Sequence, residues 1–291
     1  MAKAWAFVED GVVTDAHDAD QLVPWWSFTK TILATAILRL VRDGALDLDK
    51  PAAGRLYTLR HLLQHRSGLP DYGWLPAYHA AVARGDVPWT VPDLLARVDA
   101  HRLRYPPGEG WEYSNIGYLF VRQVIEEVTN ESLGAALRRL VLHPLSIGSA
   151  RVATEPHELV DVRMGSASSY HPAWVYHGLM VGSVQDAALL LHRLTSGSLL
   201  ADEALRMMLE RFMLPGPIAG RPWKSPGYGL GIMSGETTRG IKVAGHTGGG
   251  PGSSIAVYSR MGEERAHRTS AFFALSEEHS DPEEGAFALL A

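Results

Sequence analysis

The sequence predicts an α+β fold, namely a mostly antiparallel sheet flanked by helices, with an inserted all-helical lobe. Strand-like patterns occur near both ends of the 291-residue chain, and segments with helical periodicity lie between them. Strands from the two ends most simply pair in one sheet. We therefore expect residues 1–45 and 225–291 to form an α+β sheet lobe and residues 46–224 a helical lobe, with a cleft between the two.

The predicted strands flank the predicted helical region. Residues 4–9 and 12–16 have the pattern of two strands joined at Asp10-Gly11, a dipeptide typical of tight hairpin turns. Further strands are predicted near the other end, over residues 228–233, 241–244, 253–258 and 269–275. A closing helix is predicted over residues 282–290, with proline at its start.

Helical spacing of apolar residues is clearest after Pro24. Leu33, Ile37 and Leu40 recur on one face of a predicted helix over residues 27–43. Further helices are predicted over residues 58–64, 91–99, 116–129, 133–142 and 183–194. The last of these has Ser183 as its N-cap.

Composition and charge exclude several kinds of function. The chain has no cysteine, which excludes disulfides, thiolate metal sites and a cysteine nucleophile. A net charge of −5 without a basic block argues against nucleic-acid and membrane partners. No apolar run has transmembrane length, and the first residues lack a signal-peptide core. We therefore expect a soluble, cytoplasmic protein.

Ser27 and Lys30 stand three residues apart at the start of the predicted helix 27–43, so they share one helix face. A serine hydroxyl becomes a good nucleophile when a neighbouring base takes its proton, and a lysine amine can be that base when burial lowers its pKa. The neighbouring apolar residues would supply such burial. Taken alone, the spacing also fits an ordinary exposed serine and lysine.

Two further segments contain residues suited to the same chemistry. In Tyr113-Ser114-Asn115 the phenol could relay a proton and the amide could hold a substrate carbonyl, although the segment also fits a helix-capping turn. In Gly245-His246-Thr247-Gly248-Gly249-Gly250 a backbone N–H could donate to a developing oxyanion, although the segment also fits a glycine-rich turn between strands.

The order of these three segments resembles the motifs of penicillin-binding proteins and serine β-lactamases. In particular, the chain resembles the class C β-lactamase-like family, which includes family VIII esterases and D-aminopeptidases. The resemblance covers about residues 4–275. It extends to residues 58–70, to Pro106-Pro107-Gly108 and to Tyr228-Gly229-Leu230-Gly231.

The resemblance implies the β-lactamase/transpeptidase-like fold and a serine hydrolase that forms an acyl-enzyme on Ser27. Lys30 and Tyr113 would share the general-base and proton-relay work, and which of them takes the first proton stays open. Asn115 would position the substrate and Lys30. The backbone N–H groups of Ser27 and Gly249 would form the oxyanion hole. The resemblance implies no metal and no organic cofactor.

One departure from the family pattern concerns the substrate. His246 stands where β-lactamases have a lysine that helps to hold a substrate carboxylate, and a histidine is mostly neutral near neutral pH. We therefore expect a carboxylesterase that acts on small or medium acyl esters. The alternative is an amide or peptide hydrolase, such as a D-aminopeptidase, an amidase or a weak β-lactamase. A non-catalytic binding protein is disfavoured because the three catalytic candidates are present.

Six aromatic residues are candidates for the substrate pocket, although each also fits an ordinary core position: Trp26, Tyr72, Trp111, Tyr170, Trp174 and Trp223. His61 and His65 have zinc-ligand spacing but lack the glutamate that the zinc motif requires, so we expect no metal site there.

Relatives carry an N-terminal helix on the sheet that this sequence lacks. We therefore expect a homo-oligomer in which self-association covers that face.

Overall fold

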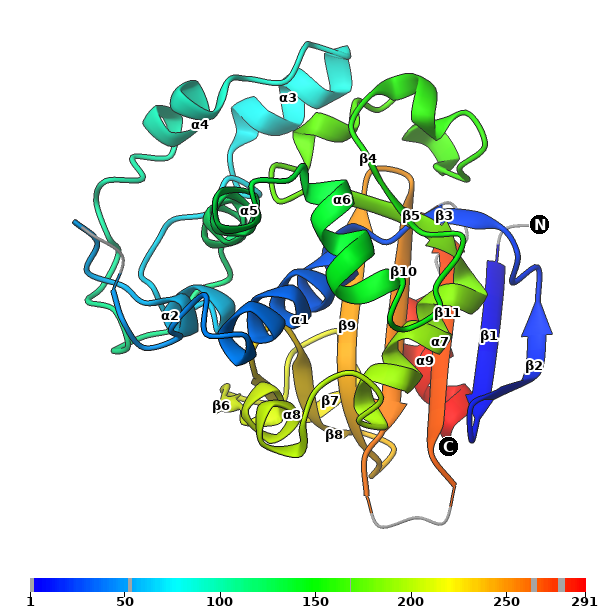
Figure 1. Ribbon diagram of the computed structural model, residues 1–291. Coiled ribbons are helices and arrows are strands. Elements are labelled where there is room, and N and C mark those ends of the chain that lie inside the picture. Colours follow the sequence, from blue (N-terminus) through cyan, green and yellow to red (C-terminus); the bar gives the residue numbers. More distant parts are fainter. Residues whose placement is uncertain (1–2, 52–53, 168, 263–265, 277–280) are drawn as a thin grey trace.

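An antiparallel eight-stranded sheet forms the centre of the structure (Figure 1). The computed structural model describes residues 3–51, 54–167, 169–262, 266–276 and 281–291. In spatial order the strands are β2 (Val12–His17), β1 (Lys3–Glu9), β11 (Arg268–Leu275), β10 (Ser253–Arg260), β9 (Lys242–Gly250), β8 (Met233–Thr237), β7 (Trp223–Tyr228) and β6 (Phe212–Met213). The predicted fold class, a mostly antiparallel sheet flanked by helices, is confirmed.

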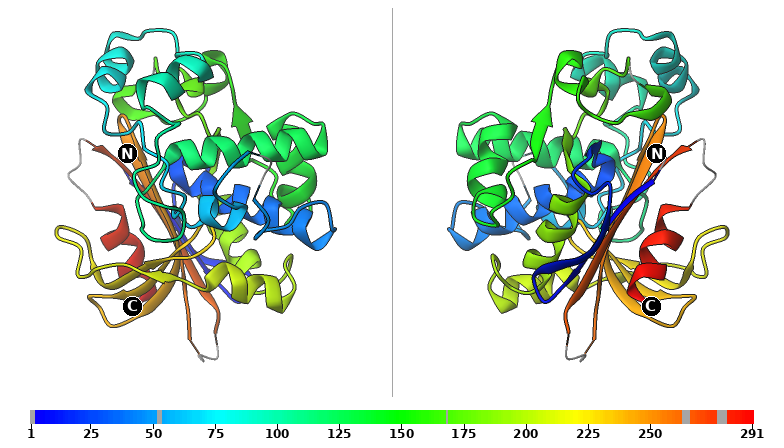
Figure 2. Two further views of the ribbon diagram at one scale, coloured as in Figure 1. Left: turned by 90° about the vertical axis from the view of Figure 1, so that its left-hand side faces the viewer. Right: turned by 90° about the vertical axis from the view of Figure 1, so that its right-hand side faces the viewer.

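The two ends of the chain meet in this sheet. β1 lies between β2 and β11, with Ala6 opposite Ala271, and a two-residue turn joins β1 to β2 as predicted. One face of β1, including Ala6, is buried in the main core beneath α7 (Val184–Thr195). The other face packs towards α9 (Pro282–Leu290), so the sheet is covered on both sides (Figure 2).

The helix α1 (Thr29–Arg42) runs through the middle of the molecule, preceded by a single 3₁₀ turn over Trp26–Phe28. Nearly every residue from Thr29 to Leu38 is fully buried, which is typical of a helix enclosed on all sides. It lies between the sheet and α5 (Asn115–Thr129), which places the start of α1 at the junction of both parts.

Four of the remaining helices lie on the far side of α1 from the sheet: α2 (Leu59–Leu63), α3 (Pro76–Arg84), α4 (Val91–Arg97) and α6 (Leu133–Leu137). The helix α8 (Asp202–Leu209) lies beside β7. A π-helical segment over Arg138–Leu142 extends α6. Three short strands that the sequence did not predict form a second sheet in the order β3 (Leu22–Pro24), β5 (Leu179–Ser183) and β4 (Arg151–Ala153). Among the described residues, no helix is long and apolar enough to cross a membrane.

Two further details differ from the sequence-based expectation. The strand predicted over residues 228–233 is wrong: β7 ends at Tyr228, β8 starts at Met233, and a turn joins them. The turn exists because Gly231 has φ +70° and lies so close to α1 that a Cβ there would be 2.8 Å from the Lys30 carbonyl oxygen. Furthermore, α7 falls inside residues 46–224 yet packs on the main sheet, and the division into two lobes stays a prediction.

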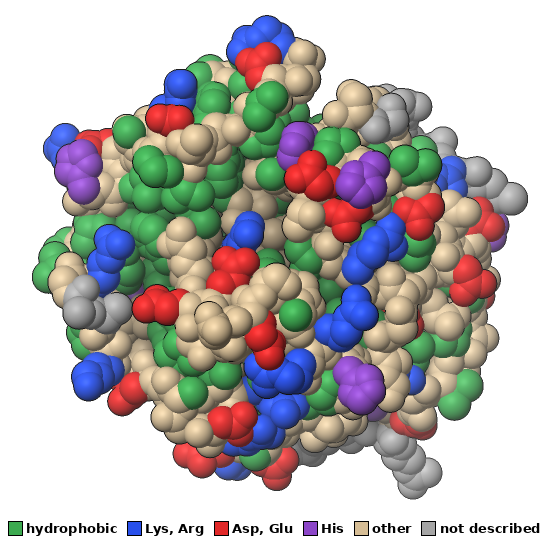
Figure 3. All heavy atoms as spheres, turned by 45° about the horizontal axis from the view of Figure 1, so that its top comes forward, with side chains coloured by type: hydrophobic (Ala, Val, Ile, Leu, Met, Phe, Trp, Pro, Cys, Tyr) green, Lys and Arg blue, Asp and Glu red, His purple; other side chains and the backbone are tan. Residues whose placement is uncertain are grey.

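The surface combines charges of both signs. On the face shown in Figure 3, basic and acidic side chains are interspersed, and hydrophobic side chains gather in one region. This distribution agrees with the small net charge of −5 and with the absence of a basic block in the sequence.

Candidate active site

Ser27 lies in the 3₁₀ turn that leads into α1, and its side chain is half-buried. The preceding residue, Trp26, has φ +42°, an unusual backbone conformation for a bulky side chain that is often found at functional sites. Lys30 lies in the first turn of α1 and is fully buried, and its Nζ donates to Ser27 Oγ at 3.1 Å. The structure thus brings together the predicted serine–lysine pair.

Tyr113 and Asn115 approach the same pair from the start of α5. Lys30 Nζ donates to Asn115 Oδ1 at 2.7 Å, and it lies 4.9 Å from the centroid of the Tyr113 ring. The Tyr113 side chain lines the same cavity as Ser27, and the polar interaction with the Ser27 side chain acts to lower the pKa of the phenol. The helix can begin here because Ser114 is its N-cap, with Oγ accepting from the Gly117 N–H at 3.0 Å.

Burial has opposite effects on the lysine and on the tyrosine. It lowers the pKa of Lys30 from 10.5 to about 7, against the opposing charge of Asp71. It raises the pKa of Tyr113, and the interaction with the Ser27 side chain only partly offsets this rise. Near neutral pH, a large fraction of Lys30 is therefore the free amine, whereas Tyr113 keeps its proton.

Three further residues complete the surroundings of Lys30 and Tyr113, and none of them was expected at the site from the sequence. Asp71 accepts from the Asn115 backbone N–H at 2.8 Å and from Asn115 Nδ2 at 3.3 Å, which turns the amide oxygen towards Lys30. His177 Nε2 lies 3.3 Å from Lys30 Nζ. Because burial holds the pKa of His177 well below 6.5, its ring is neutral and adds no charge beside the lysine.

His65 supports Tyr113 from behind. Its ring centroid lies 4.2 Å from that of Tyr113, and its Nδ1 accepts from the Ser114 N–H at 3.0 Å. His65 is fully buried, and its contact with Ser114 fixes the backbone next to the phenol. We therefore regard it as a positioning residue rather than as a metal ligand.

His246 lies on β9 and is held in one neutral form. Its Nδ1 is 2.7 Å from the Thr247 carbonyl oxygen, which can only accept, so Nδ1 bears the proton. Its Nε2 then accepts from the Tyr228 hydroxyl at 2.8 Å. Burial and the nearby Lys30 lower the pKa of His246 to about 3. The position therefore provides no positive charge for a substrate carboxylate.

β9 touches the turn that contains Ser27. A Cβ at Gly248 would lie 2.7 Å from the Ser27 backbone nitrogen and 2.5 Å from the Trp25 carbonyl oxygen, so only glycine allows this approach. The next residue, Gly249, is exposed and lines a cavity together with Ser27. The two expected oxyanion donors thus come from adjacent segments, and their role stays a prediction.

Two cavities meet at Ser27. The smaller one, of about 370 Å³, is lined by Asn115, His177 and Gly249 and by four aromatic side chains, Trp26, Tyr72, Tyr78 and Tyr170. The larger one, of about 560 Å³, is lined by Tyr113, His246 and Thr247, by Arg221 and by mostly apolar side chains, Trp74, Trp111, Leu214, Ile218, Tyr228 and Met233. Ser27 therefore has room for a substrate group on either side.

Comparisons with known proteins show the family of the chain. A family model described as Beta-lactamase matches residues 2–283. The chain belongs to the beta-lactamase family. It is 27% identical over 266 residues to the esterase EstB of Burkholderia gladioli, with 74% of this chain and 67% of the esterase covered. It is 28% identical over 268 residues to a D-aminopeptidase of Cereibacter sphaeroides, with 85% and 49% covered.

Two solved structures have the same fold as this chain. A D-stereospecific amidohydrolase from Streptomyces sp. matches with a TM-score of 0.78 and 26% identity, over 94% of this chain and 89% of that one. An octameric penicillin-binding protein homologue from Pyrococcus abyssi matches with a TM-score of 0.81 and 24% identity, over 100% and 72%. The chain spans about half the length of the D-aminopeptidase and about two thirds of the esterase. Self-association of this chain stays a prediction.

The six aromatic candidates from the sequence fall into two groups. Trp26, Tyr72, Tyr170 and Trp111 line the two cavities beside Ser27. Trp174 and Trp223 do not. Trp174 is buried against the rings of Trp89 and Tyr78, and Trp223 is enclosed behind the sheet between Tyr258 and Phe287. Proximity in sequence to a motif could not show that the indole of Trp174, in a 3₁₀ turn, and that of Trp223, on β7, are directed away from Ser27.

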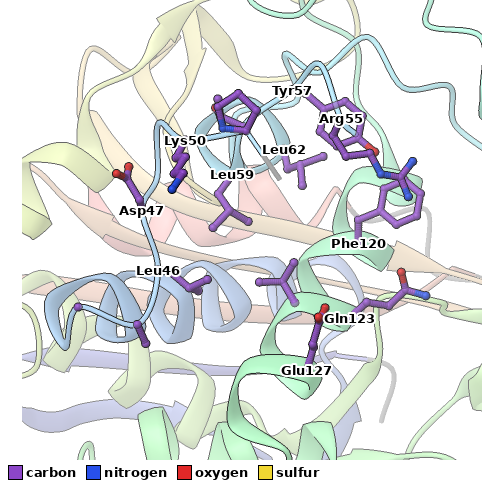
Figure 4. Close-up of a pocket in the computed structure, with 15 residues that line it drawn as sticks. Leu46, Asp47, Lys50, Arg55, Tyr57, Leu59, Leu62, Phe120, Gln123 and Glu127 are labelled. Carbon is purple, nitrogen blue, oxygen red and sulfur yellow. The ribbon is translucent and has the colours of Figure 1, made fainter. Parts of the chain in front are cut away.

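A further cavity, of about 660 Å³, lies away from Ser27. It is lined by residues between α1 and α2 and by residues of α5, with Lys50, Arg55 and Glu127 around it (Figure 4). None of the catalytic candidates lines it. Within the described parts of the chain, no group of three or more histidine, aspartate or glutamate side chains could hold a metal ion.

Proposed function

We propose that the chain is a serine hydrolase that forms an acyl-enzyme on Ser27 and acts as a carboxylesterase on small or medium acyl esters. The observation that carries this proposal is the contact between Ser27 Oγ and Lys30 Nζ, at 3.1 Å, where burial lowers the lysine pKa to about 7. A serine beside a largely uncharged amine, at the junction of two cavities, is suited to nucleophilic catalysis.

The proposed reaction has two steps. The Lys30 amine takes the Ser27 hydroxyl proton while the oxygen attacks the ester carbonyl, and the backbone N–H groups of Ser27 and Gly249 bind the oxyanion. When the C–O bond to the alcohol breaks, the proton passes to the departing oxygen by way of the Tyr113 phenol. Water then attacks the acyl group on Ser27, releases the acid and restores the hydroxyl.

The pKa directions favour Lys30 over Tyr113 as the first proton acceptor. A tyrosine whose pKa is raised holds its proton at neutral pH, whereas a lysine with a pKa of about 7 can accept one. The Tyr113 phenol is then a donor that hands its proton to the leaving group and is reprotonated from Lys30.

We assign the acyl and alcohol groups to the two cavities from the positions of these residues. Tyr113, the proposed donor to the leaving alcohol, lines the larger cavity, so the alcohol would lie there. Asn115 and Gly249, which would contact the carbonyl, line the smaller cavity, so the acyl group would lie there. A volume of about 370 Å³ suits a small or medium acyl group.

The charge of the cavities favours neutral substrates. Among the described residues that line either cavity there is no aspartate or glutamate to pair with a free α-amino group, and His246 is neutral. The alternative, a D-amino acid amidase or D-aminopeptidase, is favoured by the similarity to the D-stereospecific amidohydrolase. A parallel assay of nitrophenyl esters, D-alanyl nitroanilides and nitrocefin decides between them, since ester turnover should be fastest.

We expect kcat/KM for p-nitrophenyl acetate to rise with pH and to level off above a midpoint of about pH 7. The reason is that only the neutral Lys30 amine can act as base, so activity is lost as pH falls through the lysine pKa. The measurement is the initial rate at the isosbestic wavelength of nitrophenol, with circular dichroism at each pH to verify folding. A flat profile from pH 5 to 9 would contradict the assignment of Lys30.

We expect Trp74→Ala to raise KM for 1-naphthyl acetate about tenfold, the usual size of one aromatic contact, and to leave ethyl acetate unaffected. Trp74 lines the larger cavity although 80% of its surface is exposed, so an aromatic alcohol group would cover it. Leu56→Ala, which truncates an exposed apolar residue elsewhere, is the control. Equal losses for both esters would show that Trp74 does not contact the alcohol group.

A further inference from the structure

A buried carboxylate lies beneath the larger cavity. Glu283, on α9, is only 2% exposed and forms an ion pair with Arg221, whose Nε donates to Oε2 at 2.8 Å. Trp223 Nε1 donates to the same carboxylate at 3.2 Å, the Tyr258 hydroxyl at 2.8 Å, and the Thr247 hydroxyl at 2.5 Å. Every one of these donors therefore points at a carboxylate that the protein itself provides.

Two of these donors belong to the substrate cavity. Arg221 and Thr247 line it together with Ser27, and the Arg221 side chain is 35% exposed. A guanidinium and a hydroxyl at one wall form a suitable site for a carboxylate ligand. Here that capacity is occupied, because the Thr247 and Tyr258 hydroxyls each have one proton, and both protons are used within the cluster around Glu283.

The charge at this wall is also balanced. Burial on its own would raise the pKa of Glu283, but the hydrogen bond and the charge of Arg221 lower it below the ordinary value, so the carboxylate is ionised. It cancels the positive charge of Arg221 beside the cavity. With His246 neutral as well, an anionic substrate group would meet no uncompensated cation there.

We propose, on the basis of the hydrolase function above, that Glu283 is a specificity-determining residue that takes the place of a substrate carboxylate. It occupies Arg221 and Thr247, so the larger cavity admits uncharged leaving groups and disfavours those that bear a carboxylate. Removal of this one negative charge frees the Arg221 and Thr247 donors. It also ends the repulsion between Glu283 and an anionic leaving group.

The test compares two esters of nearly equal shape, 3-acetoxybenzamide and 3-acetoxybenzoate, which differ in the charge of the leaving group. Each kcat/KM is divided by the rate of hydrolysis in hydroxide, which removes the difference in intrinsic reactivity. We expect the wild-type protein to prefer the amide by about tenfold or more, as a like charge beside the site disfavours the carboxylate. We expect Glu283→Gln to lower this preference for the amide about tenfold. In the double variant that combines Glu283→Gln with Arg221→Ala, we expect the preference to return to about the wild-type value.

The matched control is Glu284→Gln. Glu284 is the next residue of α9 and pairs with Arg239 at the surface, so its loss changes the net charge equally without touching the cavity. The preference should stay at the wild-type value. Partial unfolding of a variant does not affect the result, because a ratio of two kcat/KM values is independent of the concentration of active protein.

A wild-type protein that hydrolyses both esters equally well, or a Glu283→Gln variant with an unchanged ratio, would overturn the proposal. If neither ester is hydrolysed, the proposed esterase function fails, and the charge preference is then read from binding. Benzamide and benzoate are titrated while tryptophan fluorescence is followed, since Trp111 and Trp74 line the cavity. Tighter binding of benzamide supports the role of Glu283, and equal binding refutes it.

Discussion

The Ser27→Ala variant should lose ester hydrolysis almost completely, with kcat/KM for p-nitrophenyl acetate reduced about 1,000-fold or more. Without the hydroxyl no acyl-enzyme can form, although the two cavities and the remaining donors still bind the ester. The fold should be unaffected, because the Ser27 side chain is small and only half-buried, and its loss removes one hydrogen bond with Lys30. The measurement is steady-state hydrolysis together with thermal melting.

Labelling supplies the control for this prediction. A fluorophosphonate probe should modify the wild-type protein on the peptide that contains Ser27, as seen by mass spectrometry, and should not modify the variant. Ser198→Ala, which removes an exposed hydroxyl far from the site in sequence, should keep full activity and labelling. Near-normal turnover by the Ser27→Ala protein would mean that another group is the nucleophile.

Lys30→Met should have opposite effects on rate and on stability. Acylation should slow about 100- to 10,000-fold, since the general base is lost. The free energy of unfolding at pH 7 should increase, because a buried lysine whose pKa falls from 10.5 to about 7 costs roughly 4 kcal/mol relative to the unfolded chain. The lost hydrogen bonds to Ser27 and Asn115 offset part of this gain.

The stability effect has a defined dependence on pH. Above pH 10.5 the amine is neutral in both states, and burial of the lysine carries no protonation penalty. As pH falls to about 7 the unfolded chain binds a proton that the folded chain does not, so the penalty grows, and below pH 7 it stays constant. Thermal melts at pH 6, 8 and 10 should therefore show the gain of Lys30→Met shrinking with rising pH.

The exposed Lys242, on β9, provides the matched control, because Lys242→Met should change neither activity nor the pH dependence of melting. A Lys30→Met protein that melts below the wild type at pH 7 would contradict the expectation. It would mean that Lys30 is held in its charged form by Asp71 and that burial is not the dominant influence on its pKa.

Local signals explain which elements could be predicted. The helix predicted over residues 116–129 is α5 (Asn115–Thr129), and α7 begins after Ser183, whose Oγ accepts from the Asp186 N–H at 3.0 Å. The strands β3 and β4 have three residues each, too few for alternation to appear. The turn at Gly231 was mistaken for a strand because its cause, the proximity of α1, is a tertiary contact.

The same distinction holds for the site. Ser27, Lys30, Tyr113 and Asn115 could be proposed from short motifs in the expected order. Asp71, His177 and Glu283 could not, as none of them belongs to a spacing that points to chemistry. Each becomes significant only through a partner far along the chain: Asn115 for Asp71, Lys30 for His177, and Thr247 for Glu283.

The pairing of β1 with β11 determines when this chain can become active during synthesis. β1 is made long before its neighbour β11 and the helix α9 that covers β11, so the sheet cannot close until both have left the ribosome. Ser27, only ten residues beyond β2, waits for β9 to reach it. A ribosome-bound chain halted before β9 should therefore remain without hydrolytic activity and depend on chaperones to shield its apolar strands.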